Sequence, residues 1–196
     1  MKYYRDSVTS LSWEFLKELN KEFKFVLIGG WAVWLYTEQL KSKDIDIVVG
    51  LSELGKLREK YDFSKNERLK KYEFRKGEVQ VDVYSVYFSK IGMEASEIIK
   101  HSQMLKGFKV PKIEVLMALK LTAWVNRRGS SKGRKDFLDL ISLMRMTDDT
   151  VNQYMSNGDL KILIKEIKLT TKVLELGLNN HKFAKSKKKW LKYLGE

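Results

Sequence analysis

The sequence of 196 residues contains no cysteine and a single proline. The lack of cysteine excludes disulfide bonds, thiolate zinc sites and cysteine nucleophiles. No apolar run reaches the roughly 18 residues that a membrane-spanning helix needs. The segment from Met1 to Asp6 also lacks the apolar stretch of a secretory signal. These absences favour a cytoplasmic protein with no membrane partner.

Charge is strongly unbalanced, because 38 lysines and arginines outnumber 25 aspartates and glutamates and give a formal net charge of +13. A surplus of this size favours polyanionic partners, since each phosphate contact releases counterions. A lysine-rich solvated surface would give the same total. The only histidines, His101 and His181, have no second histidine at ligand spacing, so we expect both at the surface.

Hydrophobic periodicity predicts an α+β chain, in which a mixed central β-sheet flanked by helices is followed by a C-terminal helical lobe. Strands are expected at Phe25 to Ile28, Asp44 to Val49, Arg68 to Phe74 and Glu78 to Tyr84. Helices are expected at Leu11 to Phe23, Trp31 to Glu38, Ser52 to Tyr61, Ala95 to Leu105, Ile113 to Asn126, Asp136 to Met146 and Leu160 to Leu176.

We divide the chain into a catalytic domain, residues 1–94, and a helical domain, residues 95–196, that closes over the cleft. The tail from Lys182 to Leu194 mixes aromatic residues with lysines. Its lysines either bind a nucleic-acid backbone or form a solvated helix face.

Three aspartates occupy corresponding positions on two predicted strands. Asp44 and Asp46 are two residues apart, so their side chains project from one face of a strand while Ile45 points to the other. Asp82 has the same arrangement between Val81 and Val83. If the strands are neighbours, three carboxylates meet at a patch that cations must neutralise. Oxygen ligands of this kind suit Mg²⁺ or Mn²⁺, although an isolated Asp-x-Asp is equally consistent with solvated residues on an exposed sheet.

Gly29 and Gly30 end one predicted strand and open a helix. Without Cβ atoms, a phosphate can approach the backbone, and the first helical N–H groups are unpaired donors. A tight turn without a ligand is the alternative. Lys41 and Ser42 precede the Asp44 strand and could contact phosphates, or could be ordinary surface residues. With the three carboxylates nearby, we interpret the turn as a nucleotide-binding site.

These segments resemble motifs of a known superfamily. Ile28 to Val33 (IGGWAV) and Lys43 to Val49 (KDIDIVV) are similar to the glycine and Asp-x-Asp motifs of the DNA polymerase beta-like nucleotidyltransferases, and Val81 to Val83 looks like their third-carboxylate strand. The Gly-Gly-Trp form resembles the minimal nucleotidyltransferases around the AbiEii/AbiGii abortive-infection toxins. The resemblance implies the nucleotidyltransferase fold and Mg²⁺-dependent transfer of a nucleoside monophosphate to a hydroxyl.

A second stretch resembles the toxin family more narrowly. Leu119 to Trp124 (LKLTAW) and Arg134 to Leu140 (RKDFLDL) look like its lysine helix and its Arg-Asp-x-x-Asp-Leu segment, although Lys135 is inserted between the arginine and the first aspartate. The match implies that Lys120 contacts the nucleotide triphosphate and that Asp136 serves the active site. From the residues alone, Lys120 could equally extend from a half-exposed helix, and Asp136 could cap a helix N-terminus.

Together these patterns predict a two-metal nucleotidyltransferase in which Asp44, Asp46 and Asp82 hold the ions. The favoured acceptor is RNA, especially the 3′ end of transfer RNA, and an antitoxin protein is a conceivable partner. A protein hydroxyl or a small molecule such as an aminoglycoside is the alternative acceptor. A non-catalytic RNA-binding module that keeps the fold is the rival from another class.

Overall fold

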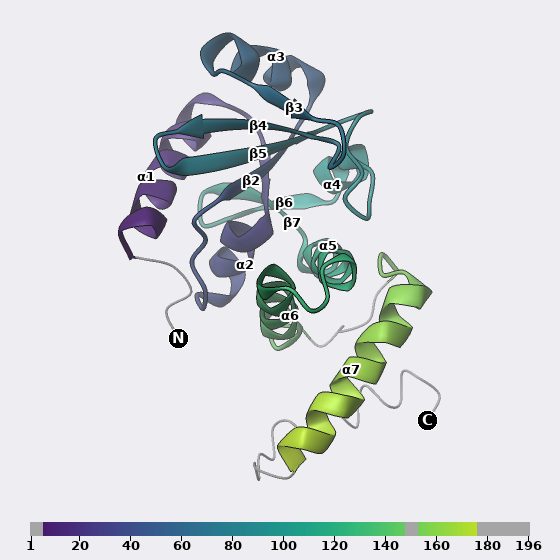
Figure 1. The fold of residues 1–196 in the computed structure, drawn as a ribbon. Helices are drawn as coiled ribbons and strands as arrows, with labels where there is room; N and C mark the ends of the chain where they lie inside the picture. Colours follow the sequence, from purple (N-terminus) through teal and green to yellow (C-terminus); the bar gives the residue numbers. More distant parts are fainter. Residues whose placement is uncertain (1–5, 148–152, 176–196) are drawn as a thin grey trace.

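The computed structural model describes residues 6–147 and 153–175, and its sheet-and-helix architecture confirms the expected α+β class (Figure 1). The main sheet has five strands in the order β1-β2-β5-β4-β3. Their bounds are β1 Val26–Ile28, β2 Ile45–Val49, β3 Ser64–Asn66, β4 Lys71–Lys76 and β5 Val79–Ser85. The short strand β3 at the sheet edge was not predicted, because its exposed polar sequence has no apolar alternation.

Strand pairing brings the predicted acidic strands together. Strand β2 runs antiparallel to β1, with Ile28 opposite Asp46, and parallel to β5, with Asp46 opposite Asp82. Alternation along the strands explains this arrangement, since Ile45 and Val81 are fully buried on the face opposite the carboxylates. The expectation that the two acidic strands are neighbours is therefore confirmed.

Helices α1 (Asp6–Glu22), α2 (Gly29–Thr37) and α3 (Leu51–Lys60) belong to the first half of the chain. Helices α1 and α2 are joined by aromatic packing. The centroid of the Trp13 ring lies 5.0 Å from the ring centroids of Trp31 and Trp34. Trp31 is buried, and its indole N–H donates to Ser12 Oγ at 2.9 Å. Trp124 is also buried, whereas Trp34 is only partly buried.

The segment expected as a helix from Ala95 to Leu105 is instead a shorter helix followed by a hairpin. Helix α4 covers Ala95–Lys100, and strands β6 (Ser102–Leu105) and β7 (Phe108–Pro111) pair antiparallel. The turn between them requires left-handed backbone at Lys106 (φ 49°) and Gly107 (φ 83°). Strand β7 lies beside β1, so the second half of the chain is not purely helical.

Three longer helices complete the described chain: α5 (Ile113–Asn126), α6 (Ser131–Met144) and α7 (Asn157–Glu175). Helices α5 and α6 pack together beneath the sheet (Figure 1). Helix α6 begins five residues earlier than expected, because Ser130 is its N-cap and its Oγ accepts from the Gly133 N–H at 3.0 Å. Asp136 therefore lies inside the helix, and the interpretation of Asp136 as an N-cap is wrong.

Gly133 is needed where α6 crosses the end of α5. A Cβ at Gly133 would overlap the Arg127 carbonyl oxygen and lie 2.8 Å from the carbonyl carbon. The segment from Ser130 to Gly133 is thus a tightly packed helix start. Across residues 6–147 and 153–175, no helix is both long and apolar enough to cross a membrane. The boundary at residue 94 stays a prediction, and the basic tail and His181 lie outside the described residues.

Candidate active site

A cavity of about 610 Å³ lies between the acidic face of the sheet and helices α5 and α6. This volume suits a ligand of nucleotide size. Eight of the nine residues predicted from the sequence as site residues line it: Gly29, Gly30, Ser42, Asp44, Asp46, Asp82, Lys120 and Asp136. The ninth, Lys41, is exposed and does not line the cavity.

The carboxylates of β2 and β5 are close enough to repel each other. Asp46 faces Asp82 across the parallel strand pair, and Asp44 precedes β2 by one residue. Burial, together with the charges of Asp82 and Asp44, raises the pKa of Asp46 to about 6, although Lys120 and Lys71 act in the opposite direction. Such mutual repulsion is what a bound cation would relieve.

Asp82 is held by neighbours on its own sheet. Lys71 on β4 forms an ion pair with Asp82 and lies 3.1 Å from a Glu73 oxygen, while Gln80 Nε2 donates to Asp82 Oδ1 at 2.9 Å. In the described parts of the chain, no three acidic or histidine side chains are grouped so that they could hold a metal ion. The three aspartates share one cavity but do not form the ready-made metal cluster that the sequence predicted.

The donor set nevertheless suits a divalent metal. Asp44, Asp46 and Asp82 offer only carboxylate oxygens, which are the ligands that Mg²⁺ prefers. The raised pKa of Asp46 also indicates an excess of negative charge at this point of the cavity. Binding would require Asp82 to exchange its ion pair with Lys71 for the metal.

The glycine turn lies directly against the acidic strand. Helix α2 begins at Gly29, whose φ of 67° is in the left-handed region. A Cβ at Gly29 would overlap Asp46 Oδ2 and lie 2.7 Å from the carboxyl carbon. Ile28, the N-cap residue, has no side-chain acceptor for the first helical N–H groups. The predicted opposition of the glycine turn and the Asp-x-Asp strand is thus present in the geometry.

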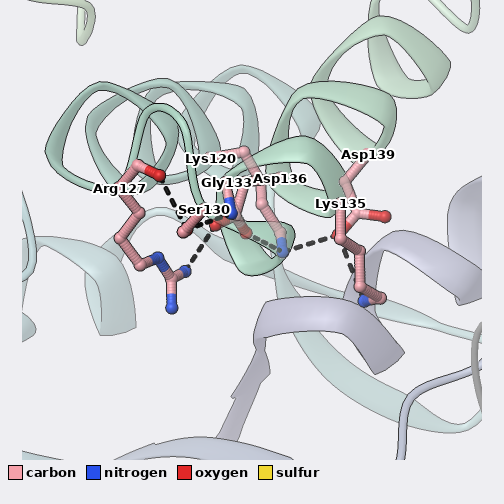
Figure 2. A network of polar contacts seen from close by, with 7 residues as sticks. All are labelled: Lys120, Arg127, Ser130, Gly133, Lys135, Asp136 and Asp139. Carbon is pink, nitrogen blue, oxygen red and sulfur yellow. Dashed lines mark hydrogen bonds and ion pairs between the residues drawn. The ribbon is translucent and has the colours of Figure 1, made fainter.

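Helices α5 and α6 contribute a buried ion-pair network (Figure 2). Lys120 Nζ donates to Asp139 Oδ2 at 2.7 Å and to Asp136 Oδ1 at 3.2 Å. The Arg127 guanidinium, at the C-cap position of α5, lies 2.6 Å from Asp136 Oδ2. Lys120 is only 7% exposed, so the alternative of a half-exposed lysine is wrong. Burial disfavours its charge, but Asp139 and Asp136 outweigh this effect and raise the pKa of Lys120.

Several residues around the cavity were not predicted as site residues. Tyr84 lines it, and burial, then the charges of Asp46 and Asp82, raise the pKa of the Tyr84 hydroxyl. Lys71 shares the cavity, and Lys135 reaches it from α6. Only the i, i+4 spacing of Lys135 and Asp139 on one helix could have suggested their pairing.

Comparison with solved structures identifies the fold. No protein-family model matches the chain, and no curated protein is similar to it. Solved structures do match. JHP933 from Helicobacter pylori is 16% identical with a TM-score of 0.58 over 87% of this chain and 78% of its own. An antigenic nucleotidyltransferase-like protein from Paracoccidioides brasiliensis is 15% identical with a TM-score of 0.53, over 87% of this chain and 91% of that protein.

This chain has the nucleotidyltransferase fold. The Megavirus polyadenylate synthase shares it at 12% identity and a TM-score of 0.51, over 85% of this chain and 38% of the larger protein. So does the antibiotic-resistance factor ANT(2″)-Ia in solution, at 12% identity and a TM-score of 0.51 over 86% and 95%. The narrower resemblance to the AbiEii/AbiGii toxins is not confirmed by these comparisons.

Proposed function

We propose that this chain is a metal-dependent nucleotidyltransferase that transfers a nucleoside monophosphate from a nucleotide triphosphate to a hydroxyl. The observation that carries the proposal is one cavity in which Asp46 and Asp82 lie beside the Gly29–Gly30 turn and opposite the Lys120 network. The fold supports the proposal, because carboxylates that could hold a metal line the same cavity as cations that could bind phosphates.

Each role in the proposed reaction is assigned to particular side chains of the cavity. Asp44, Asp46 and Asp82 would hold Mg²⁺ or Mn²⁺, which when bound neutralises phosphate charge and lowers the pKa of the attacking hydroxyl. The acceptor oxygen bonds to the α-phosphorus while the bond to the leaving pyrophosphate breaks. The hydroxyl proton passes to solvent or to Asp82. Lys120, anchored by Asp136 and Asp139, contributes a fixed positive charge to the triphosphate.

For the acceptor we favour RNA. Three exposed basic residues from separate parts of the chain, Arg68, Lys90 and Lys132, line the cavity. Exposed cations at the mouth of a cavity attract the phosphates of a polyanionic acceptor. A protein hydroxyl or an aminoglycoside is the competing acceptor. An aminoglycoside is itself cationic, so these three residues weigh against it.

Labelled nucleotide triphosphates decide between the acceptors. Each of the four would be incubated with the protein, Mg²⁺ and, in parallel, total RNA, lysate protein or a panel of aminoglycosides. We expect label in the RNA fraction, and none with Asp46→Asn, which should show no loss of thermal stability. Label in protein or in an aminoglycoside would replace the acceptor.

A non-catalytic module that keeps the fold would label nothing. It would also show no Mg²⁺-dependent heat on calorimetric titration with nucleotide triphosphates. Equal transfer by the wild-type protein and Asp46→Asn would refute the proposed chemistry, whatever the acceptor.

A further inference from the structure

Lys135 reaches the cavity at a point where no sequence motif assigns it a role. The Lys135 side chain is 10% exposed although it comes from the amphipathic helix α6. An ideal Cβ built on Gly30 would lie 2.7 Å from Lys135 Nζ and 2.7 Å from Ser42 Oγ. An ammonium group from α6 and a hydroxyl group from the segment before β2 therefore converge over a residue that has no side chain.

These two polar groups have few partners. Within the ranges that the structure describes, Lys135 donates one hydrogen bond, to Asp139 Oδ2 at the long distance of 3.4 Å. An ammonium group carries three donors, so its capacity is largely unused. No hydrogen bond joins Ser42 Oγ to any described residue, although Ser42 is 6% exposed. Both residues line the cavity, so their unused hydrogen-bonding capacity is available to a ligand bound there.

The charge around Lys135 and Ser42 favours an anionic ligand. Asp139 Oδ2 accepts from Lys120 at 2.7 Å as well as from Lys135, so one carboxylate oxygen holds two ammonium groups side by side (Figure 2). Lys120, Lys135 and Arg127 carry three positive charges. Asp136 and Asp139 supply only two negative charges, so the network keeps a net positive charge. The first N–H groups of α2, at Gly29 and Gly30, add the positive end of the helix dipole.

We propose, resting on the proposed function, that Lys135 and Ser42 form a subsite for one phosphate of the triphosphate chain against the bare face of Gly30. Lys120 binds a neighbouring phosphate from the same carboxylate anchor. Asp139 is the positioning residue that sets the spacing of the two lysines. The insertion of Lys135 between Arg134 and Asp136 is then a functional feature of this chain.

Inorganic tripolyphosphate, titrated calorimetrically in EDTA at low ionic strength, tests the subsite without metal or acceptor. We expect Lys135→Met to weaken binding by at least about tenfold and Ser42→Ala by about threefold, because one charge-assisted and one neutral hydrogen bond are lost. The matched control is Arg134→Met, which removes a positive charge from an exposed neighbour on the same helix that does not line the cavity. It should remain within about twofold of the wild-type protein, which screening of an exposed charge allows.

The subsite and the proposed function fail separately. Equal binding by wild-type protein and Lys135→Met, an equal loss in Arg134→Met, or no binding by the wild-type protein would overturn the subsite. Transfer activity could persist in each case. A selective loss in Lys135→Met supports the subsite even where no nucleotide is transferred. If Lys135→Met folds poorly, the loss of tripolyphosphate affinity in Ser42→Ala tests the subsite instead.

Discussion

The contact between the glycine turn and the acidic strand makes Gly29→Ala the sharpest test of the site's geometry. Gly29 has a φ of 67°, where an alanine is strained, and its added methyl group would overlap Asp46 Oδ2. The substitution therefore perturbs the backbone of the turn and the position of a proposed metal ligand at once. Gly77→Ala separates the two effects, because Gly77 has a φ of 58° and nothing within 4 Å of its Cβ position.

The magnitudes follow from these two contributions. Left-handed backbone costs an alanine about 1–2 kcal/mol, partly offset by the lower entropy of the unfolded chain. We therefore expect Gly77→Ala to lose about 1 kcal/mol. Displacing the Asp46 carboxylate adds a steric cost of about 1–3 kcal/mol in Gly29→Ala. In a chain of this size, a total loss of about 3 kcal/mol lowers the melting temperature by roughly 6–12 °C.

Activity discriminates more strongly than stability. A displacement of about 1 Å at a catalytic group can reduce the rate about 100-fold, so Gly29→Ala should lose at least that factor in nucleotide transfer while Gly77→Ala retains full activity. Thermal unfolding and the labelled-nucleotide assay measure the two quantities on the same protein samples. Equal melting temperatures and equal activities for the two variants would refute the close approach of Gly29 to Asp46.

Three further predictions concern charges in the cavity. Because the pKa of Asp46 is raised from 3.8 to about 6, the folded state keeps a proton that the unfolded state has lost, so metal-free stability should fall as pH rises from about 4 to about 6. In urea titrations, Asp46→Asn should remove this pH dependence. It should also raise the free energy of unfolding at pH 7 by about 1–2 kcal/mol, a figure reduced because Asp46 is partly exposed. Lys120→Met leaves Asp136 and Asp139 without their lysine partner and should lower the free energy of unfolding by about 3–5 kcal/mol. A loss below about 1 kcal/mol in urea unfolding would show that these ion pairs are not buried as described. Lys71→Met releases Asp82 and should tighten Mn²⁺ binding at least about threefold, and unchanged affinity in a Mn²⁺ titration would show that Lys71 does not compete.

The acidic strands could be predicted from the sequence because alternation fixes which side chains share a face. Asp46 and Asp82 alternate with isoleucine and valine, so burial of the apolar face forces both carboxylates to the other. The glycine turn was predictable for a related reason, since a glycine pair between a strand and a helix permits the positive φ found at Gly29.

Other parts of the site could not be predicted, because they depend on packing between distant segments. Nothing local to Lys71 indicates that it would pair with Asp82 on the adjacent strand, since that contact needs the β4–β5 register. The hairpin after Lys100 was mistaken for helix because its strands are four residues long and its Lys106–Gly107 turn is a weak signal. The Lys135–Ser42 convergence depends on where α6 packs against α2.

The charges of this cavity are arranged so that ligand can replace protein partners. Lys71 neutralises Asp82, while Asp136 and Asp139 neutralise Lys120, so each wall carries its own internal counterions. Buried pairs of this kind add little net stability, because desolvation offsets most of the Coulomb attraction. Their value is positional: Asp82 and Lys120 are each held in place by a partner that a metal or a phosphate could supplant. Ligand binding would then exchange ion pairs rather than bury new charge, which keeps its cost low.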